Sequence, residues 1–279
     1  MDNIITTERI DAYCLSLLAD ERAAGTISKY RHDLTAFAHW LDGRIVSKET
    51  AAGWKNYLSH CGYTPRTINS MLAAVNGFCR FMAWHIKVKF LKIQRQIFRD
   101  SSRELTKEEY DRLLAAARES GQERLALIME TLCATGIRVS ELRYITVEAA
   151  LAGRATITLK GKIRTILLPA KLCRKLVKYA RKQKTASGEI FLTKSGRPIT
   201  RRQVWFELKR LCKAAGVEAS KVFPHNLRHL FATTFYRACR DIVRLADMLG
   251  HSSIDTTRIY LMVSGAEQQR QLDRLGLVS

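Results

Sequence analysis

The chain has 279 residues, of which 47% are hydrophobic and only 4 are prolines. This length is large for one compact core and comfortable for two domains, and the composition excludes an intrinsically disordered protein. The formal net charge is +21, and residues 101–279 carry most of it, with 33 Lys and Arg against 17 Asp and Glu. A field of one sign attracts a polyanion, so the charge favours a nucleic-acid partner and leaves an acidic membrane surface as an alternative.

The sequence indicates no membrane span, no signal peptide and no disulfide or zinc site. The chain has no apolar run of about eighteen residues, so we expect no membrane span. The start, Met1-Asp2-Asn3-Ile4, lacks the basic and apolar regions of a signal peptide, and we therefore expect a cytoplasmic location. The 7 cysteines are scattered without a Cys-x-x-Cys pair, which predicts neither a disulfide framework nor a zinc site.

The first third of the chain has the spacing of helices. Apolar residues recur three or four apart over residues 27–41 and again over residues 68–82, and Pro65 stands where a helix can begin. We expect four helices within residues 4–86, forming a helical bundle domain over residues 1–90. A basic linker is predicted at residues 91–103.

A second domain is predicted over residues 104–279. It opens with Thr106 and Glu109, which have the spacing of a helix capping box. Runs at 155–159 and 163–168 predict a β-hairpin, and a further short strand is expected at 190–192. The predicted fold class is therefore mainly α with two domains: an N-terminal helical bundle and a C-terminal α+β domain with a small antiparallel sheet.

Two residues of the helix after Pro224 have the chemistry for phosphate. His225 and Arg228 are three apart and share one helix face. The arginine offers a charged planar fork for phosphate oxygens, and the histidine can exchange a proton near neutrality. His229 stands four residues after His225, as in zinc-binding helices, but the motif's Glu and a third ligand are missing, so we expect no metal and a structural His229.

Further candidates each have a simple structural reading when taken alone. Arg138 and Glu141 have the spacing of a surface ion pair. Lys160 could be a solvated lysine in a turn, and Tyr260 could be an aromatic residue of the core. Together with His225, Arg228 and His251, however, they supply what cleavage of a phosphodiester by a tyrosine requires. Cations hold the phosphate, imidazoles manage protons and a phenol attacks.

The order of these residues resembles the tyrosine recombinase (phage-integrase-like) family, most closely its compact Xer-type members. The resemblance covers nearly the whole chain. It rests on three motifs: Ala134-Thr135-Gly136-x-Arg138-x-x-Glu141-Leu142, His225-x-Leu227-Arg228-His229-x-x-Ala232-Thr233 and Leu249-Gly250-His251-x-x-x-x-Thr256-Thr257-x-x-Tyr260.

The resemblance implies a role for each matched residue. Arg138 and Arg228 would clamp the phosphate, with His251 as a second phosphate contact and Glu141 as the supporting acid. His225 would handle protons and Tyr260 would be the nucleophile. Lys160 would be the hairpin lysine, but Leu159 stands where the family often has Gly. Lys162 therefore stays open as the catalytic lysine, and Lys160 is placed first because it opens the turn.

The family's activity is strand cleavage and rejoining through a 3′-phosphotyrosine, without metal, nucleotide or other cofactor. The resemblance implies double-stranded DNA recombination sites as partners and a tetramer assembled on DNA, with a second recombinase or an accessory protein left open. The N-terminal domain would be the core-binding (SAM-like) domain, embracing DNA. The tail at residues 263–279, with Leu272, Leu275 and Leu277, would dock on a neighbour or fold back on its own domain.

Two other functions compete with this interpretation. A type IB topoisomerase would use the same tyrosine chemistry to relax DNA as a monomer. A non-catalytic DNA-binding regulator would explain the charge and the helices but would leave the matched residues without a purpose. Integration, excision and resolution all remain open as the recombinase's task.

Overall fold

The computed structural model describes residues 3–94, 101–159, 162–260, 269–270 and 272–276. The chain divides into two compact units, residues 1–95 and 96–279, and each is described by itself. The predicted mainly helical, two-domain fold with one small antiparallel sheet is confirmed. The domain limits at residues 90 and 103 remain predictions, and residues 95–100 of the expected linker lie outside the described part.

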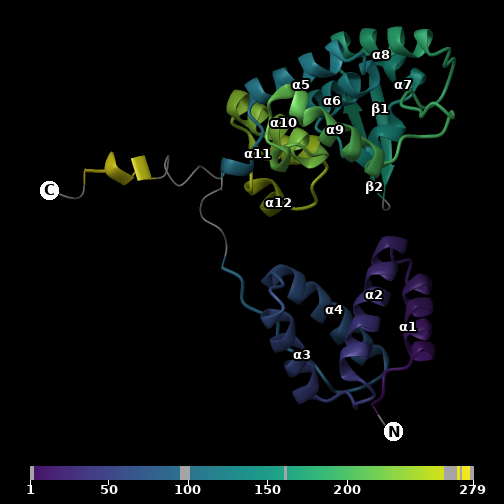
Figure 1. Ribbon diagram of the computed structural model, residues 1–279, viewed down its shortest axis with the longest axis vertical. Helices are drawn as coiled ribbons and strands as arrows, with labels where there is room; N and C mark the ends of the chain where they lie inside the picture. Colours follow the sequence, from purple (N-terminus) through teal and green to yellow (C-terminus); the bar gives the residue numbers. More distant parts are fainter. Residues whose placement is uncertain (1–2, 95–100, 160–161, 261–268, 271, 277–279) are drawn as a thin grey trace. The chain divides into compact units, whose positions relative to one another are not determined.

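The described residues of the N-terminal unit form a bundle of four helices (Figure 1). Its core centres on aromatic and aliphatic side chains that have almost no exposed surface, among them Phe37, Trp54 and Phe78. Thr64 caps the fourth helix and Pro65 is its first residue, as the sequence predicts. The helices are α1 (Thr7–Ala19), α2 (Ala24–Leu41), α3 (Lys48–His60) and α4 (Pro65–Phe81).

The basic segment after α4 begins as part of this unit. Asn76 of α4 exchanges two hydrogen bonds with the backbone of Val88, at 2.9 and 3.0 Å. Asn69, two turns earlier, does the same with Leu91 at 2.7 and 2.9 Å. These two asparagines therefore hold the chain against α4 up to residue 91. The basic composition of the segment alone suggests an exposed linker.

The C-terminal unit is helical around one hairpin (Figure 1). The Thr106 capping box is present, with the Thr106 N–H donating to Glu109 at 2.9 Å and the Glu109 N–H donating to Thr106 at 3.2 Å. Its elements are η1 (Ser101–Arg103), α5 (Lys107–Glu119), α6 (Glu123–Thr135), η2 (Val139–Tyr144), α7 (Val147–Ala152), β1 (Arg154–Leu159), β2 (Lys162–Leu167), α8 (Ala170–Lys182), α9 (Arg201–Ala215), η3 (Ala219–Lys221), α10 (Pro224–Cys239), α11 (Ile242–Leu249) and α12 (Ile254–Arg258).

The predicted hairpin is present, and each strand begins one residue earlier than expected. β1 and β2 pair antiparallel from Arg154 opposite Leu167 to Leu159 opposite Lys162. The expected strand at 190–192 is wrong, because the pairing of this stretch is limited to one isolated bridge, from Leu192 to Pro198. The side chains of Ile190 and Phe191 are buried and pack into the core of this unit.

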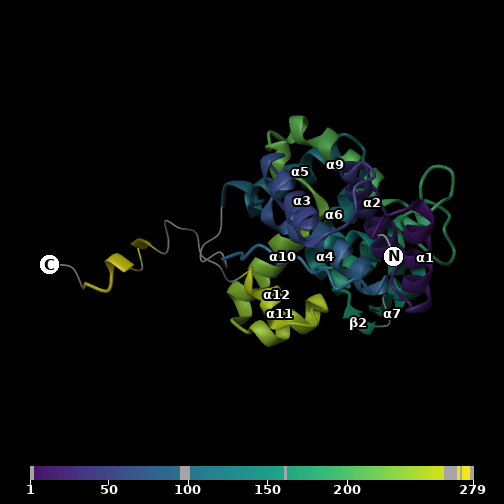
Figure 2. The ribbon, with the colours of Figure 1, turned by 90° about the horizontal axis from the view of Figure 1, so that it is seen from below.

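Helices α6 and α10 form the centre of this unit, and α11 and α12 lie together beside α10 (Figure 2). Helix α6 ends at Gly136, which adopts a left-handed conformation with φ +65° that glycine tolerates best. A Cβ at this position would overlap the ring of Phe231 on α10 and lie 3.1 Å from Leu249. The turn before Arg138 is therefore packed directly against the segments that carry Arg228 and His251.

We predict that Gly136→Ala destabilises this unit much more than Gly153→Ala. Both glycines end a helix with similar positive φ, but a Cβ at Gly153 meets no atom within 4 Å. The left-handed conformation costs either alanine about 1–2 kcal/mol, and the overlap with Phe231 adds about 1–3 kcal/mol at Gly136 alone. Urea unfolding of both variants measures the difference, and equal losses would contradict the packing described.

Candidate active site

Arg138 and Glu141 form a partly buried pair at the start of η2. Glu141 is only 1% exposed, so this is not the surface pair that the spacing alone allows. The Arg138 backbone N–H donates to one carboxylate oxygen of Glu141 at 2.7 Å, and its Nη1 donates to the other at 3.0 Å. Glu141 therefore orients the Arg138 guanidinium. The Arg138 side chain is 42% exposed, so the guanidinium still faces solvent.

Arg228 is the largest side chain in the described core with almost no exposed surface. Its Nη1 donates to the carbonyl of Gly136, and its Nη2 donates to the carbonyl of Leu249 at 2.7 Å. Nη2 also lies 3.0 Å from Nε2 of His251. Burial and the charge of Arg138 lower the pKa of Arg228 to about 10, while interaction with the Tyr260 phenol opposes the shift. The guanidinium therefore stays charged at neutral pH.

His251 connects Arg228 to helix α12. Since Arg228 can only donate, Nε2 of His251 accepts, and the ring proton belongs on Nδ1. Nδ1 lies 2.8 Å from the hydroxyl of the buried Thr257, which is its acceptor. Burial, followed by the charges of Arg228 and Arg138, lowers the pKa of His251 to about 4. The imidazole is therefore neutral at neutral pH and holds Arg228 in place.

Tyr260 lies directly beside this cluster and is 4% exposed. Its ring stacks on His251 with centroids 6.1 Å apart, and it packs edge-on against His229 at 4.9 Å. Its phenol interacts with Arg228. The contact agrees with the predicted structural role of His229, which supports the tyrosine ring.

His225 opens onto a cavity of about 300 Å³ that Arg138, Arg201 and Arg228 also line, together with Trp205. Partial burial lowers the pKa of His225, and the charges of Arg228, Arg138 and Arg201 lower it further. A neutral imidazole beside several cations can accept a proton when an anion enters the cavity.

The hairpin lysine is the one predicted site residue that the structure leaves undescribed. Lys160 lies outside the described residues, and only the backbone of Lys162, at the start of β2, lies within them. The choice between the two lysines therefore stays open.

Three contributors to the site escape sequence reasoning. Arg164 of β2 donates to Glu141 at 2.7 Å, Thr257 accepts from His251, and Arg201 lines the cavity. Thr257 stands inside a matched motif, which was a usable signal. Arg164 and Arg201 are two of many basic residues in this region, so composition does not distinguish them.

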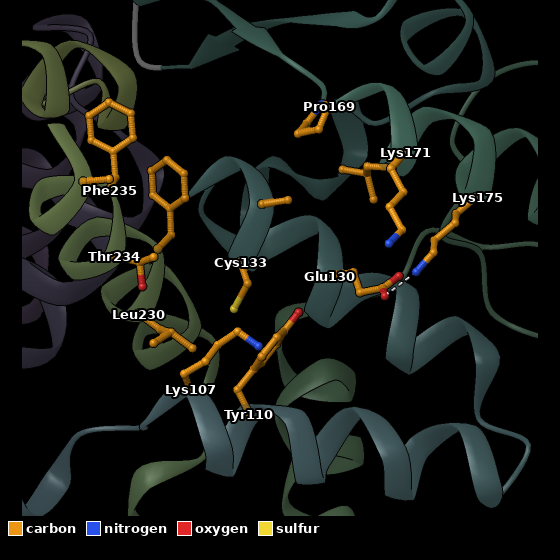
Figure 3. A pocket seen from close by; sticks show the side chains of 14 residues that line it. Lys107, Tyr110, Glu130, Cys133, Pro169, Lys171, Lys175, Leu230, Thr234 and Phe235 are labelled. Carbon is orange, nitrogen blue, oxygen red and sulfur yellow. Dashed lines mark hydrogen bonds and ion pairs between the residues drawn. The ribbon is translucent and has the colours of Figure 1, made fainter.

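Other features of the described residues lie apart from this cluster. No three His, Cys, Asp or Glu side chains gather there as a metal-binding group, and no helix there is long and apolar enough to cross a membrane. A second cavity, of about 510 Å³, is lined by side chains such as Cys133, Leu230 and Phe235, and by the ion pair of Glu130 and Lys175 (Figure 3). None of the predicted site residues lines it.

Two helical units, with two arginines, two histidines and a tyrosine brought together in the second, are what the tyrosine recombinase class requires. The Phage integrase family model matches residues 103–267, and the model "Phage integrase, N-terminal SAM-like domain" matches residues 10–85. The chain belongs to the phage integrase family, and the predicted tyrosine recombinase class is confirmed. This result favours a site-specific recombinase over the topoisomerase and regulator alternatives.

Individual relatives agree with the family assignment. The chain is 30% identical to the tyrosine recombinase XerC of Roseiflexus sp. (strain RS-1), over 93% of this chain and 90% of that protein. It is 27% identical to XerA of Pyrococcus furiosus, over 99% and 97%. Its fold matches the crystal structure of a lambda integrase tetramer bound to a Holliday junction with a TM-score of 0.73 and 20% identity, over 93% and 78%.

The lowered pKa of His251 predicts a pH effect on stability. Between its folded pKa of about 4 and its ordinary value of 6.5, the unfolded chain binds more protons, so stability falls as pH falls through this window. His251→Gln removes this contribution and should flatten the loss. Urea unfolding at pH 7 and pH 5 compares the two proteins, and an equal loss in both would contradict a neutral, partly buried His251.

Proposed function

We propose that this site cleaves one DNA strand by attack of Tyr260 on the scissile phosphate. The Tyr260 oxygen bonds to phosphorus, the bond to the 5′-oxygen breaks, and a 3′-phosphotyrosine and a free 5′-hydroxyl result. The observation that carries the proposal is the placement of the phenol beside Arg228, a buried guanidinium, and against His251. A nucleophile next to fixed positive charge is the arrangement that phosphoryl transfer needs.

Two proton transfers accompany the reaction. A phenol is protonated at neutral pH, so its proton must leave as it attacks. His225 is the proposed acceptor, since its lowered pKa keeps it neutral and ready to take a proton. The hairpin lysine donates a proton to the departing 5′-oxygen, as a general acid.

Negative charge that develops on the phosphoryl oxygens is stabilised by the two arginines. Arg138 lies on the cavity wall and is oriented by Glu141, whereas Arg228 is fixed in the core. His251 supports this charge stabilisation by holding Arg228. Fixed donors need no rearrangement during the reaction, which makes them more effective than solvent.

The covalent ester conserves the energy of the broken bond, so a 5′-hydroxyl from another strand can reverse the step without a nucleotide cofactor. Repeated between two duplexes, through a Holliday junction, this exchange is recombination. We propose double-stranded recombination sites as the substrate and a tetramer on DNA as the working form, which the lambda integrase tetramer supports. The tail exposes Leu272 and Leu275, and an apolar edge of this kind suits exchange between protomers.

Tyr260→Phe is expected to abolish covalent attachment to DNA while DNA affinity stays within about twofold, because only the nucleophilic oxygen is removed. The measurement is denaturing electrophoresis after incubation with a nicked substrate, paired with a binding assay. Tyr236→Phe is the matched control, since Tyr236 packs against the same apolar cluster as Tyr260. Covalent complexes formed by Tyr260→Phe at the control's level would overturn the proposal.

A modified substrate identifies the general acid. A 5′-bridging sulfur leaves as a thiolate without needing a proton, so it bypasses a missing acid. We expect alanine at the catalytic lysine, Lys160 or Lys162, to lower the cleavage rate on normal DNA by about 10²–10⁴-fold and to have a far smaller effect on the sulfur substrate. The other lysine serves as the control. If neither variant shows this difference, the general acid is not in the hairpin.

A further inference from the structure

Arg164 joins three separate parts of the catalytic unit. It lies on β2, where it pairs with Ile157 of β1, and its side chain is only 16% exposed. Its Nη2 donates to Glu141 at 2.7 Å, and its Nη1 donates to the carbonyl of Met248 at 2.9 Å. One guanidinium thus links the hairpin, η2 and the last turn of α11.

We propose that Arg164 is a positioning residue for strand cleavage, coupling the lysine-bearing hairpin to both phosphate-clamping arginines. The inference rests on the proposed function of the site. It extends that function to a residue outside the matched motifs.

The coupling to Arg138 passes through Glu141. One Glu141 oxygen accepts from the Arg138 backbone N–H and from Arg164, and the other accepts from Arg138 Nη1. A carboxylate that is 1% exposed needs compensating charge and donors. Without Arg164, the Arg138 side chain alone compensates Glu141. This 42% exposed guanidinium would then be drawn toward Glu141 and away from an incoming phosphate.

The coupling to Arg228 passes through the end of α11. Arg164 holds the carbonyl of Met248, and the next carbonyl, that of Leu249, accepts from Arg228. Gly250 follows with φ +64°, and a Cβ there would lie 2.5–2.8 Å from three atoms of the Arg164 side chain. The glycine before His251 therefore meets two demands, a left-handed helix end and close approach of Arg164.

The hairpin is coupled by covalent geometry. Arg164 is two residues from Lys162 and four from Lys160, on the strand that leads out of the turn. Anchoring of Arg164 therefore fixes the described strand β2, which begins at Lys162. A displacement of about 1 Å in a reacting group can cost about a hundredfold in rate.

The test compares Arg164→Met with Arg154→Met. Both remove one positive charge from the same hairpin, but Arg154 is exposed on β1. We expect Arg164→Met to lower the single-turnover rate of covalent complex formation by about 10- to 100-fold. Its dissociation constant for DNA should stay within about threefold of the control's, since both variants lose the same charge.

A second variant, Arg164→Lys, tests the proposal if Arg164→Met fails to fold. It keeps the charge beside Glu141, but an ammonium lacks the fork that reaches two acceptors in different directions. We expect near-normal thermal stability and a rate at least about tenfold below that of the unaltered protein. A Lys variant that cleaves at the unaltered rate would refute the proposal.

Chemical rescue provides a readout that a general loss of stability does not give. Arg164→Ala leaves space for a free guanidinium ion between Glu141 and Met248. Millimolar methylguanidinium, at ionic strength matched with sodium chloride, should restore part of the cleavage by Arg164→Ala and none by Arg154→Ala. Equal responses of the two variants would count against the positioning role.

Amide hydrogen exchange tests the coupling without any activity. Exchange at residues 248–251 should be faster in Arg164→Met than in Arg154→Met, and unchanged exchange would overturn the proposal. If the unaltered protein forms no covalent complex, the proposed function fails instead. If it cleaves and the Arg164 variants match it, only the inference about Arg164 fails.

Discussion

A positive charge with almost no exposed surface lies at the centre of the catalytic unit. Burying the guanidinium of Arg228 is unfavourable unless its N–H groups are paired. The carbonyls at the ends of α6 and α11 and the ring of His251 provide this pairing. These contacts join α10 to the end of α6 and to the segment from Leu249 to His251, which are far apart in the sequence. Most of the site geometry described above follows from this constraint.

The electrostatics of the site follow from the same arrangement. Burial and neighbouring cations lower the pKa of both His225 and His251, so neither adds charge at neutral pH. Glu141 is an acid paired with two arginines, Arg138 and Arg164. Positive charge therefore exceeds negative charge among these groups, and the single negative charge of an entering phosphodiester would offset part of this excess. This excess favours an anion that gains charge during its reaction.

Much of this organisation could be predicted from the sequence because it depends on local sequence patterns. Helical periodicity, the capping box at Thr106 and the turn between β1 and β2 each depend on neighbouring residues. The motif residues Arg138, Arg228 and His251 are indeed brought together. The burial of Arg228 and Glu141 could not be predicted, since spacing alone gives Arg138 and Glu141 the appearance of an exposed pair.

What escaped prediction depends on contacts between distant segments. Arg164 reaches partners 23 and 84 residues away, and no period or motif records such a contact. The segment at 190–192 has the composition of a strand, yet in the structure its backbone pairing is limited to an isolated bridge from Leu192 to Pro198. Asn69 and Asn76 likewise bind a basic segment that resembles a free linker.

The proposed reaction requires that Tyr260 becomes bonded to DNA within this cluster of positive charge. Mass spectrometry of the unaltered protein, after reaction with a nicked DNA substrate and digestion, tests it most directly. We expect one DNA-linked peptide, which contains Tyr260 joined to a 3′-phosphate. A nucleotide adduct on any other side chain would contradict it.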